Sequence, residues 1–189
     1  MRLRLRSKMG LVGTVERRLF DKNGNPKKMF ADNFVWRILK RFFNVDVQIP
    51  FLTGFWTYGV IRRNLVPTVG KAAVADQVGG TTTSPTTAIA IGIGVTGAAA
   101  GDTTLESEIT TNGGERGAAS VTNQTTTTAG DTERWIKTFS FTGTFAVTEE
   151  GLLDNNAAGG VLLARQVFSA VNIVNGDSLQ ITHNVQVTT

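Results

Sequence analysis

Two segments in the C-terminal part of the chain alternate apolar and polar side chains with the two-residue period of a half-buried β-strand. In residues 133–147 the apolar positions are Trp135, Phe139, Phe141, Phe145 and Val147. In residues 178–187 they are Leu179, Ile181, Val185 and Val187. Successive side chains of a strand point to opposite faces, so each segment is expected to bury one face and expose a Thr-, Ser-, Asn- or Gln-rich one.

Three further segments favour the same class of structure. The sequence AIAIGIGV at 88–95 reads as a buried strand, RGAASVTNQTTTT at 116–128 as a polar strand or pair, and VLLARQVFSAVNIV at 161–174 as another strand. Gly and Asn turns separate them at short spacing. The pattern predicts a mainly β fold, an antiparallel β-sandwich of jelly-roll type.

The N-terminal part predicts a basic extension with a hairpin and one amphipathic helix. Arg alternates with Leu over residues 1–8, a second strand follows at 11–20, and DKNGNPKK at 21–28 supplies turn residues. Residues 32–44 place Phe34, Val35, Ile38, Leu39, Phe42 and Phe43 on one helical face. Asp32 or Asn33 is the expected N-cap. We expect this helix to pack on its own domain rather than on a membrane.

Charge divides the chain near Lys71. Residues 1–71 carry 15 Lys and Arg against 4 Asp and Glu, whereas residues 72–189 carry 4 against 11. We therefore predict a basic N-terminal anchoring region over 1–71 and a Thr/Gly-rich β-module over 72–189. A basic region favours contact with the acidic part of another copy or with an acidic neighbouring protein. The predicted partner-binding residues are Arg2, Arg4, Arg6, Lys8, Arg17, Arg18, Arg37, Lys40 and Arg41.

The chain offers little catalytic chemistry. It has no Cys and one His, so thiolate zinc sites, Cys nucleophiles and multi-His metal sites are excluded. His183 lies on the apolar side of an alternating strand, which favours a structural or subunit-contact role. Glu149 and Glu150 are adjacent on a strand end and should point to opposite sides. We predict no enzymatic activity, catalytic residue, metal, cofactor or small-molecule substrate.

The segment from Gly92 to Gly97 matches the GxGxxG pattern of dinucleotide-binding loops. The Ala-rich sequence after it is interrupted by Gly101, so it offers little helix to receive a phosphate, and no repeating βαβ pattern follows. We interpret it as a Gly-rich strand and turn. Nucleic-acid binding remains an alternative, because residues 1–63 combine Arg and Lys with Phe, Trp and Tyr.

Three motifs between residues 88 and 187 resemble a module of small structural proteins from tailed-bacteriophage virions. They are AIAIGIGVTGAAAGDTTLESEI, VTEEGLLDNNAAGGVLLARQVFSAV and NGDSLQITHNV, in that order. The matching positions are Gly92, Gly94, Gly101, Asp102, Thr103, Leu105, Glu108, Thr148, Glu149, Gly151, Leu152, Gly159, Gly160, Leu163, Ala164, Arg165, Phe168, Gly176, Asp177, Ser178 and Leu179. The resemblance covers about half the chain and does not extend to the basic region.

The resemblance implies a β-sandwich that assembles as a symmetric oligomer, with a trimer favoured, and carries no catalytic residues. It leads us to predict a capsid decoration or cement protein whose basic region binds the major capsid protein or another virion protein. A tail, neck or fibre-base component is the alternative within this class. The predicted location is the virion, after assembly in the host cytoplasm.

Overall fold

The computed structural model describes residues 10–43, 48–81 and 84–188 of the 189-residue chain. The predicted strand over residues 1–8, which contains Arg2, Arg4, Arg6 and Lys8, lies outside the described residues. The described strands are β1 (Gly10–Phe20), β2 (Pro26–Lys27), β3 (Met29–Asp32), β4 (Gly54–Thr57), β5 (Val60–Arg63), β6 (Ala88–Gly92), β7 (Gly117–Ala118), β8 (Ser120–Gln124), β9 (Thr132–Ser140), β10 (Phe145–Leu153), β11 (Leu162–Ile173) and β12 (Ser178–Thr188). The helices are α1 (Phe34–Phe43) and α2 (Thr68–Gly79).

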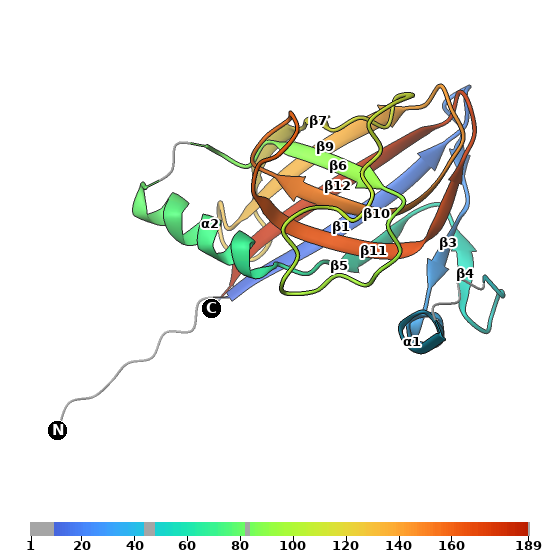
Figure 1. The fold of residues 1–189 in the computed structure, drawn as a ribbon, viewed down its shortest axis with the longest axis horizontal. Helices are drawn as coiled ribbons and strands as arrows, with labels where there is room; N and C mark the ends of the chain where they lie inside the picture. The colour runs from blue at the N-terminus through green and yellow to red at the C-terminus, as the bar shows by residue number, and fades with distance from the viewer. Residues whose placement is uncertain (1–9, 44–47, 82–83, 189) are drawn as a thin grey trace.

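The strands form antiparallel sheets, which confirms the mainly β prediction (Figure 1). The largest sheet has the order β2-β1-β12-β9-β8, with β5 also paired to β1. A second sheet has the order β11-β10-β6-β7, and β3 pairs with β4 in a small two-stranded sheet. The small sheet and α1 lie together at one end of the molecule, and α2 lies at the other (Figure 1).

One apolar cluster joins the two larger sheets. Val15, Phe139 and Ile181 come from the first sheet, and Ile91 and Val171 come from the second. These side chains are almost completely buried, and burial of each large apolar side chain contributes on the order of 1.5–3 kcal/mol. The alternating pattern of the sequence therefore identified the inward faces of β9 and β12. Its last member, Val187, is exposed near the end of β12.

The segment 133–147 is divided between the two sheets. Its first part lies in β9 and its last part begins β10, with a turn at Thr142–Thr144 between them. Phe141 lies just after β9, remains buried and donates its backbone N–H to the carbonyl of Asp177. The alternating pattern, interrupted at Lys137 and Gly143, therefore marks the core-facing residues of two strands that pair with different partners.

The N-terminal hairpin is present, and its first described strand is part of the body. Asp21 accepts hydrogen bonds from the backbone N–H groups of Asn23 and Asn25 in the turn between β1 and β2. Strand β1 pairs with β12 along its full length. Lys71, where composition and charge change, lies inside α2. The change at Lys71 therefore divides the sequence by charge, while the residues before it still contribute to the main sheet.

The structure has α1 where a helix was predicted and a second helix that was not predicted. Asn33 is the N-cap of α1, since its side-chain oxygen accepts from the backbone N–H groups of Val35 and Trp36. The expectation of a single helix was wrong, because α2 follows Pro67 and ends at Gly80 in the left-handed conformation. Ala-rich α2 has no apolar stripe of helical period, so no amphipathic pattern indicated it.

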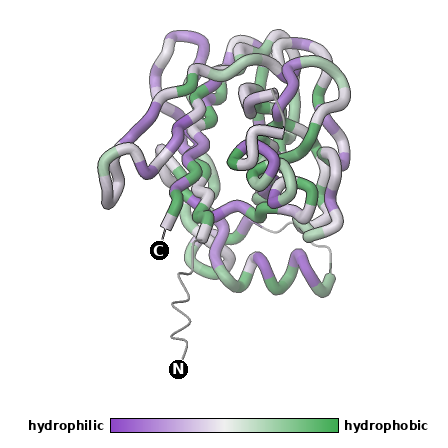
Figure 2. The backbone as a smooth tube through the Cα atoms, turned by 90° about the vertical axis from the view of Figure 1, so that its left-hand side faces the viewer, coloured by the Kyte–Doolittle hydropathy of each residue, from purple (hydrophilic) through white to green (hydrophobic). Residues whose placement is uncertain are grey.

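Close packing of α2 on the second sheet depends on Gly70. A Cβ atom at this position would overlap the backbone carbonyl of Leu163 in β11. Figure 2 looks at the molecule from the α2 end and shows the helix along the edge of the body. The absence of a side chain at Gly70 thus allows the helix to approach the strand backbone.

Gly70→Ala is expected to lower the free energy of unfolding by about 1–3 kcal/mol, because the added methyl group forces α2 away from β11. Gly79→Ala is the matched control in the same helix, since its Cβ would meet only the Thr81 side chain at 3.9 Å. This control should be neutral or stabilising by up to about 1 kcal/mol. Urea unfolding midpoints of the two variants measure the difference, and equal midpoints would contradict this account of Gly70.

Asp131 organises the turn between β8 and β9. Its carboxylate accepts hydrogen bonds from the backbone N–H groups of Thr128, Thr126 and Thr127 and from the side chain of Gln186. These bonds favour the ionised carboxylate and hold the pKa of Asp131 well below its usual range.

Because its folded pKa lies below the unfolded value of about 3.9, the ionised Asp131 stabilises the fold above that pH. The contribution is lost as the pH falls through the folded pKa. Asp131→Asn should therefore be less stable than the wild type at pH 7, and the difference should shrink in acid. Urea midpoints across a pH series test this; a difference that stays constant down to about pH 2 would refute it.

Candidate functional site

Helix α1 turns most of its apolar face to solvent. Trp36 is its one buried residue, whereas the side chains of Phe34 and Phe42 are each 71% exposed and Phe43 is 68% exposed. The helix packs on its own domain through Trp36, with Ile38 and Leu39 half-buried, but the other members of the predicted apolar face, Phe34, Val35, Phe42 and Phe43, are exposed. The helix is held at its N-terminal end, where Asn33 caps it and also donates its side-chain amide to the carbonyl of Leu52.

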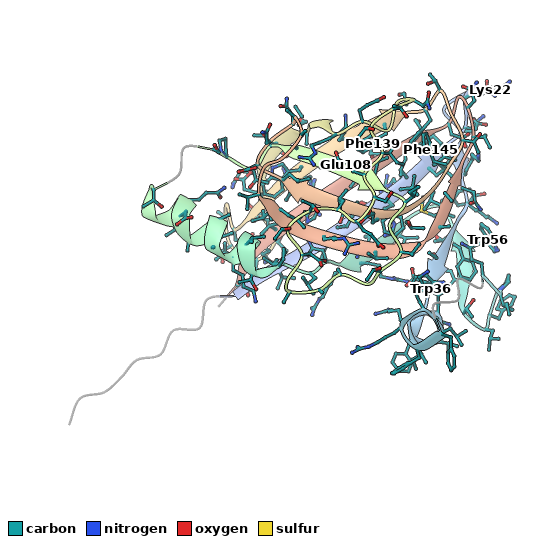
Figure 3. The ribbon with its side chains drawn as sticks, in the orientation of Figure 1. Lys22, Trp36, Trp56, Glu108, Phe139 and Phe145 are labelled. Carbon is teal, nitrogen blue, oxygen red and sulfur yellow. The ribbon has the colours of Figure 1, made fainter. Side chains whose placement is uncertain are left out.

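Exposed aromatic side chains continue from α1 onto the neighbouring loop and β4. Phe51, at the loop tip, is 97% exposed and has a left-handed backbone with φ of 67°. Its backbone N–H donates to the carbonyl of Gly54, and Thr53 closes the loop on Ile49. Figure 3 shows Trp56 on β4 beside the α1 end of the molecule. The aromatic surface is defined here as the exposed side chains of Phe34, Phe42, Phe43 and Phe51; Phe55 and Trp56 are also exposed and lie on opposite faces of β4.

A basic cleft of about 770 Å³ lies beside this surface, between α1 and the edge of the second sheet. Arg37, Lys40 and Arg41 of α1 line it together with Arg63 from β5. Arg165 also lines it, but its guanidinium is paired with the buried carboxylate of Glu149 and the partly exposed carboxylate of Asp102. No carboxylate is among the described residues that line the cleft.

The structure brings together three of the predicted partner-binding residues, Arg37, Lys40 and Arg41, at this cleft. Arg37 lies 3.8 Å from the carboxylate of Asp32 and remains largely exposed. Arg18 is exposed on β1 and forms an ion pair with Glu16, away from the cleft lining.

Arg17 is inside the protein. Its side chain is 1% exposed, donates from Nη1 to the Gln166 side chain at 2.7 Å and lies over the ring of Phe168. Burial lowers the pKa of Arg17 to about 10, against the opposing charges of Asp32 and Glu150. This guanidinium therefore connects β1 to β11 within the chain and is not accessible at the surface of one copy.

The adjacent residues Glu149 and Glu150 belong to two different side-chain clusters. Glu149 is fully buried and accepts from Nε and Nη2 of Arg165 at 2.9 and 2.8 Å. It also accepts from the backbone N–H groups of Gly94, Glu106 and Ser107.

Arg165 holds a second carboxylate through Nη1, which donates to Asp102 at 2.7 Å. Burial alone would lower the pKa of Arg165, but hydrogen bonds and charges from Asp102 and Glu149 raise it above its usual range. Glu149 and Arg165 together fasten the irregular segment 93–108 to β10 and β11.

The Gly-rich segment contributes to this cluster and is not followed by the helix on which a dinucleotide-binding loop depends. Strand β6 ends at Gly92, and no helix follows in residues 93–116. A Cβ atom at Gly92 or Gly94 would collide with the carboxylate of Glu149. The hydroxyl of Thr148 donates to the carbonyl of Gly94 at 2.7 Å. These glycines are thus explained by the space that Glu149 occupies.

His183 is completely buried between the sheets. Its Nδ1 lies 3.3 Å from the carboxylate of Glu150, and its Nε2 contacts the side-chain amide of Asn64. The carboxylates of Glu149 and Glu150 therefore point to opposite sides of β10, as predicted. Neither carboxylate faces an open site. Among the described residues, no three acidic or His side chains are grouped to hold a metal ion.

Comparisons with protein-family models, with curated proteins and with solved structures find no match to this chain. None of the helices in the described ranges is long and apolar enough to cross a membrane.

Sequence reasoning missed the exposure of the aromatic side chains and the contribution of Arg63 to the cleft. Aromatic residues at the density found in residues 1–63 usually form a core, which hides their exposure from sequence reasoning. The charge pattern could have indicated the basic side of the helix, because residues 33–45 contain three cations and no acidic residue. Arg63 could have been found only with the pairing of β5 to β1, which is a contact between distant parts of the sequence.

Glu149→Gln is expected to lower the free energy of unfolding by about 3–5 kcal/mol, because it leaves the buried Arg165 without its main counter-charge. Glu115→Gln is the control, because Glu115 is an exposed carboxylate outside this cluster. Its substitution should cost less than about 1 kcal/mol. Chemical unfolding of both variants measures the contrast; similar losses would show that the Glu149–Arg165 pair does not hold the segment.

Proposed function

We propose that this chain is a non-enzymatic structural protein of a tailed-bacteriophage virion and acts as a capsid decoration or cement protein. Its two larger sheets would be the jelly-roll-like β-sandwich of such a module. The basic N-terminal residues would bind the major capsid protein or another virion protein, and the module would form a symmetric oligomer. The protein would be assembled in the host cytoplasm and remain in the virion.

The observation that carries the proposal is the convergence of the motif residues. The motifs at 92–108, 148–152 and 163–168 are separated along the chain, yet Gly94, Asp102, Glu149 and Arg165 form one cluster, in which Asp102 is partly exposed and the other three are buried. The order of the motifs is therefore explained by contacts among their residues in one folded unit. Such contacts are expected of a structural module. The buried carboxylates and His183 are occupied by internal contacts, which supports a structural role.

Attachment is supported by the position of the basic residues. Arg37, Lys40 and Arg41 face an open cleft, and residues 1–9 add Arg2, Arg4, Arg6 and Lys8 in the sequence directly before β1. The cations of α1, together with those in the sequence before β1, suit contact with an acidic protein surface.

Nucleic-acid binding is the second candidate, favoured by the basic cleft beside exposed Trp56 and Phe55. It predicts retention on single-stranded DNA that falls steeply as salt rises. Equal elution of the wild type and a Lys40→Glu, Arg41→Glu variant from immobilised DNA would exclude the cleft as a nucleic-acid site.

Copy number per particle tests the proposed function. Quantitative mass spectrometry of purified virions, scaled to the major capsid protein, should give hundreds of copies for a capsid decoration protein. A dozen or so copies would instead assign the chain to the tail, neck or fibre base. Absence from purified particles would refute the structural proposal.

Deletion of residues 1–9 tests the basic anchor. The deletion stops before Gly10, so β1 keeps its full pairing with β12 and the thermal midpoint should be unchanged. Incorporation into particles should fall at least about tenfold when these four cations are removed. Normal incorporation of a folded deletion variant would show that attachment does not use this segment.

A further inference from the structure

The aromatic surface has the features of an interface that is incomplete in one copy. Large contiguous apolar patches are uncommon on isolated soluble proteins and mark sites of association. Phe34, Phe42 and Phe51 are each more than two-thirds exposed, although an amphipathic helix normally buries such a face. Phe51 is held outward by an ordered loop in a backbone conformation that non-glycine residues rarely adopt.

The charges around the aromatic surface decide what kind of partner it fits. Arg37, Lys40 and Arg41 flank it on α1, while the nearby carboxylate of Asp32 is buried. Two copies meeting through this same surface would bring cations together, which is unfavourable. The partner surface should therefore be apolar at its centre and acidic at its rim.

A cleft with those properties lies at the α2 end of the same molecule. It has a volume of about 270 Å³ and is lined mainly by small and apolar side chains, including Val69, Ala73 and Leu163. Its two charged lining residues, Asp76 and Asp154, are both acidic. Neither carboxylate forms an ion pair within the described residues, and Lys71 of the same helix is not part of the lining.

We infer that this chain associates head to tail, with the aromatic surface of one copy docking its Phe51 loop into the α2 cleft of a second copy. Helix α1, which carries most of the aromatic surface, and helix α2, which lines the cleft, lie at opposite ends of the long axis (Figure 1), so each copy keeps one of each surface free for the next. Repetition of such a contact closes a ring or extends a filament. A closed ring of three copies would be the trimer expected for the proposed function. The number of copies in the ring rests on that proposed function.

Two variants separate the surfaces. The first carries Phe51→Asn and Arg41→Glu; Asn tolerates the left-handed backbone at this position, so the fold should be kept. The second carries Ala72→Arg and Asp76→Lys, both at exposed α2 positions that line the cleft. Val121→Asn is the control, since Val121 is an exposed apolar residue on β8, outside both surfaces. Thermal unfolding confirms that each variant is folded.

Sedimentation velocity over a micromolar concentration series gives the readout. We expect the wild type and Val121→Asn to associate and each double variant alone to lose at least about tenfold in association constant. An equimolar mixture of the two variants should form one-to-one dimers that grow no further, because one intact aromatic surface and one intact cleft remain. A dimer of one copy of each variant, formed only in the mixture, is a result that an isologous contact cannot give.

Three results would overturn the inference. They are a wild type that stays monomeric at all concentrations, a cleft variant that associates normally, and a mixture that stays monomeric. Vesicles of phosphatidylcholine and phosphatidylglycerol serve as a parallel probe; binding that needs Phe51 in a monomeric protein would assign the surface to a lipid instead. A monomer that is still found in virions would refute only the interface, whereas an oligomer absent from virions would refute only the proposed function.

Discussion

The buried ion pair between Glu149 and Arg165 is the interaction on which the second sheet and its covering segment depend. A lone carboxylate in this position would cost several kcal/mol, so Glu149 is tolerated only with Arg165 and its backbone donors in place. Residues 93–108 have no regular strand or helix that would fix them otherwise. Long irregular segments normally need such specific contacts to adopt one conformation in a compact domain.

Polar contacts also specify how the two larger sheets face each other. Glu150 on β10 meets His183 on β12, and Gln166 on β11 meets Arg17 on β1. A one-residue slip of any of these strands would turn its polar side chain to the other face and leave the partner buried without a bond. The apolar cluster supplies most of the stabilisation, while these pairs select one alignment of strands.

The strand pattern of the C-terminal part could be predicted because alternation is a local signal. Trp135, Phe139, Leu179 and Ile181 are buried, as their spacing predicted. The sheet in which each strand lies depends on distant pairing, such as β1 with β12, and no local pattern encodes it. The adjacency of the two acidic residues correctly predicted opposite directions. Their partners, Arg165 and His183, could be assigned only from the folded arrangement.

Helix α1 shows that a correct prediction of an amphipathic helix does not determine what its apolar face contacts. Its amphipathic pattern specifies that Phe34 and Phe42 need a partner surface, but the pattern does not say whether that surface belongs to the same chain. Within one copy only Trp36 is fully buried and Ile38 and Leu39 are half-buried, so the exposed phenylalanines remain available to a partner surface. In the inferred head-to-tail contact, the cations of α1 would meet the carboxylates of the α2 cleft, whereas a symmetric pairing of like surfaces would bring like charges together.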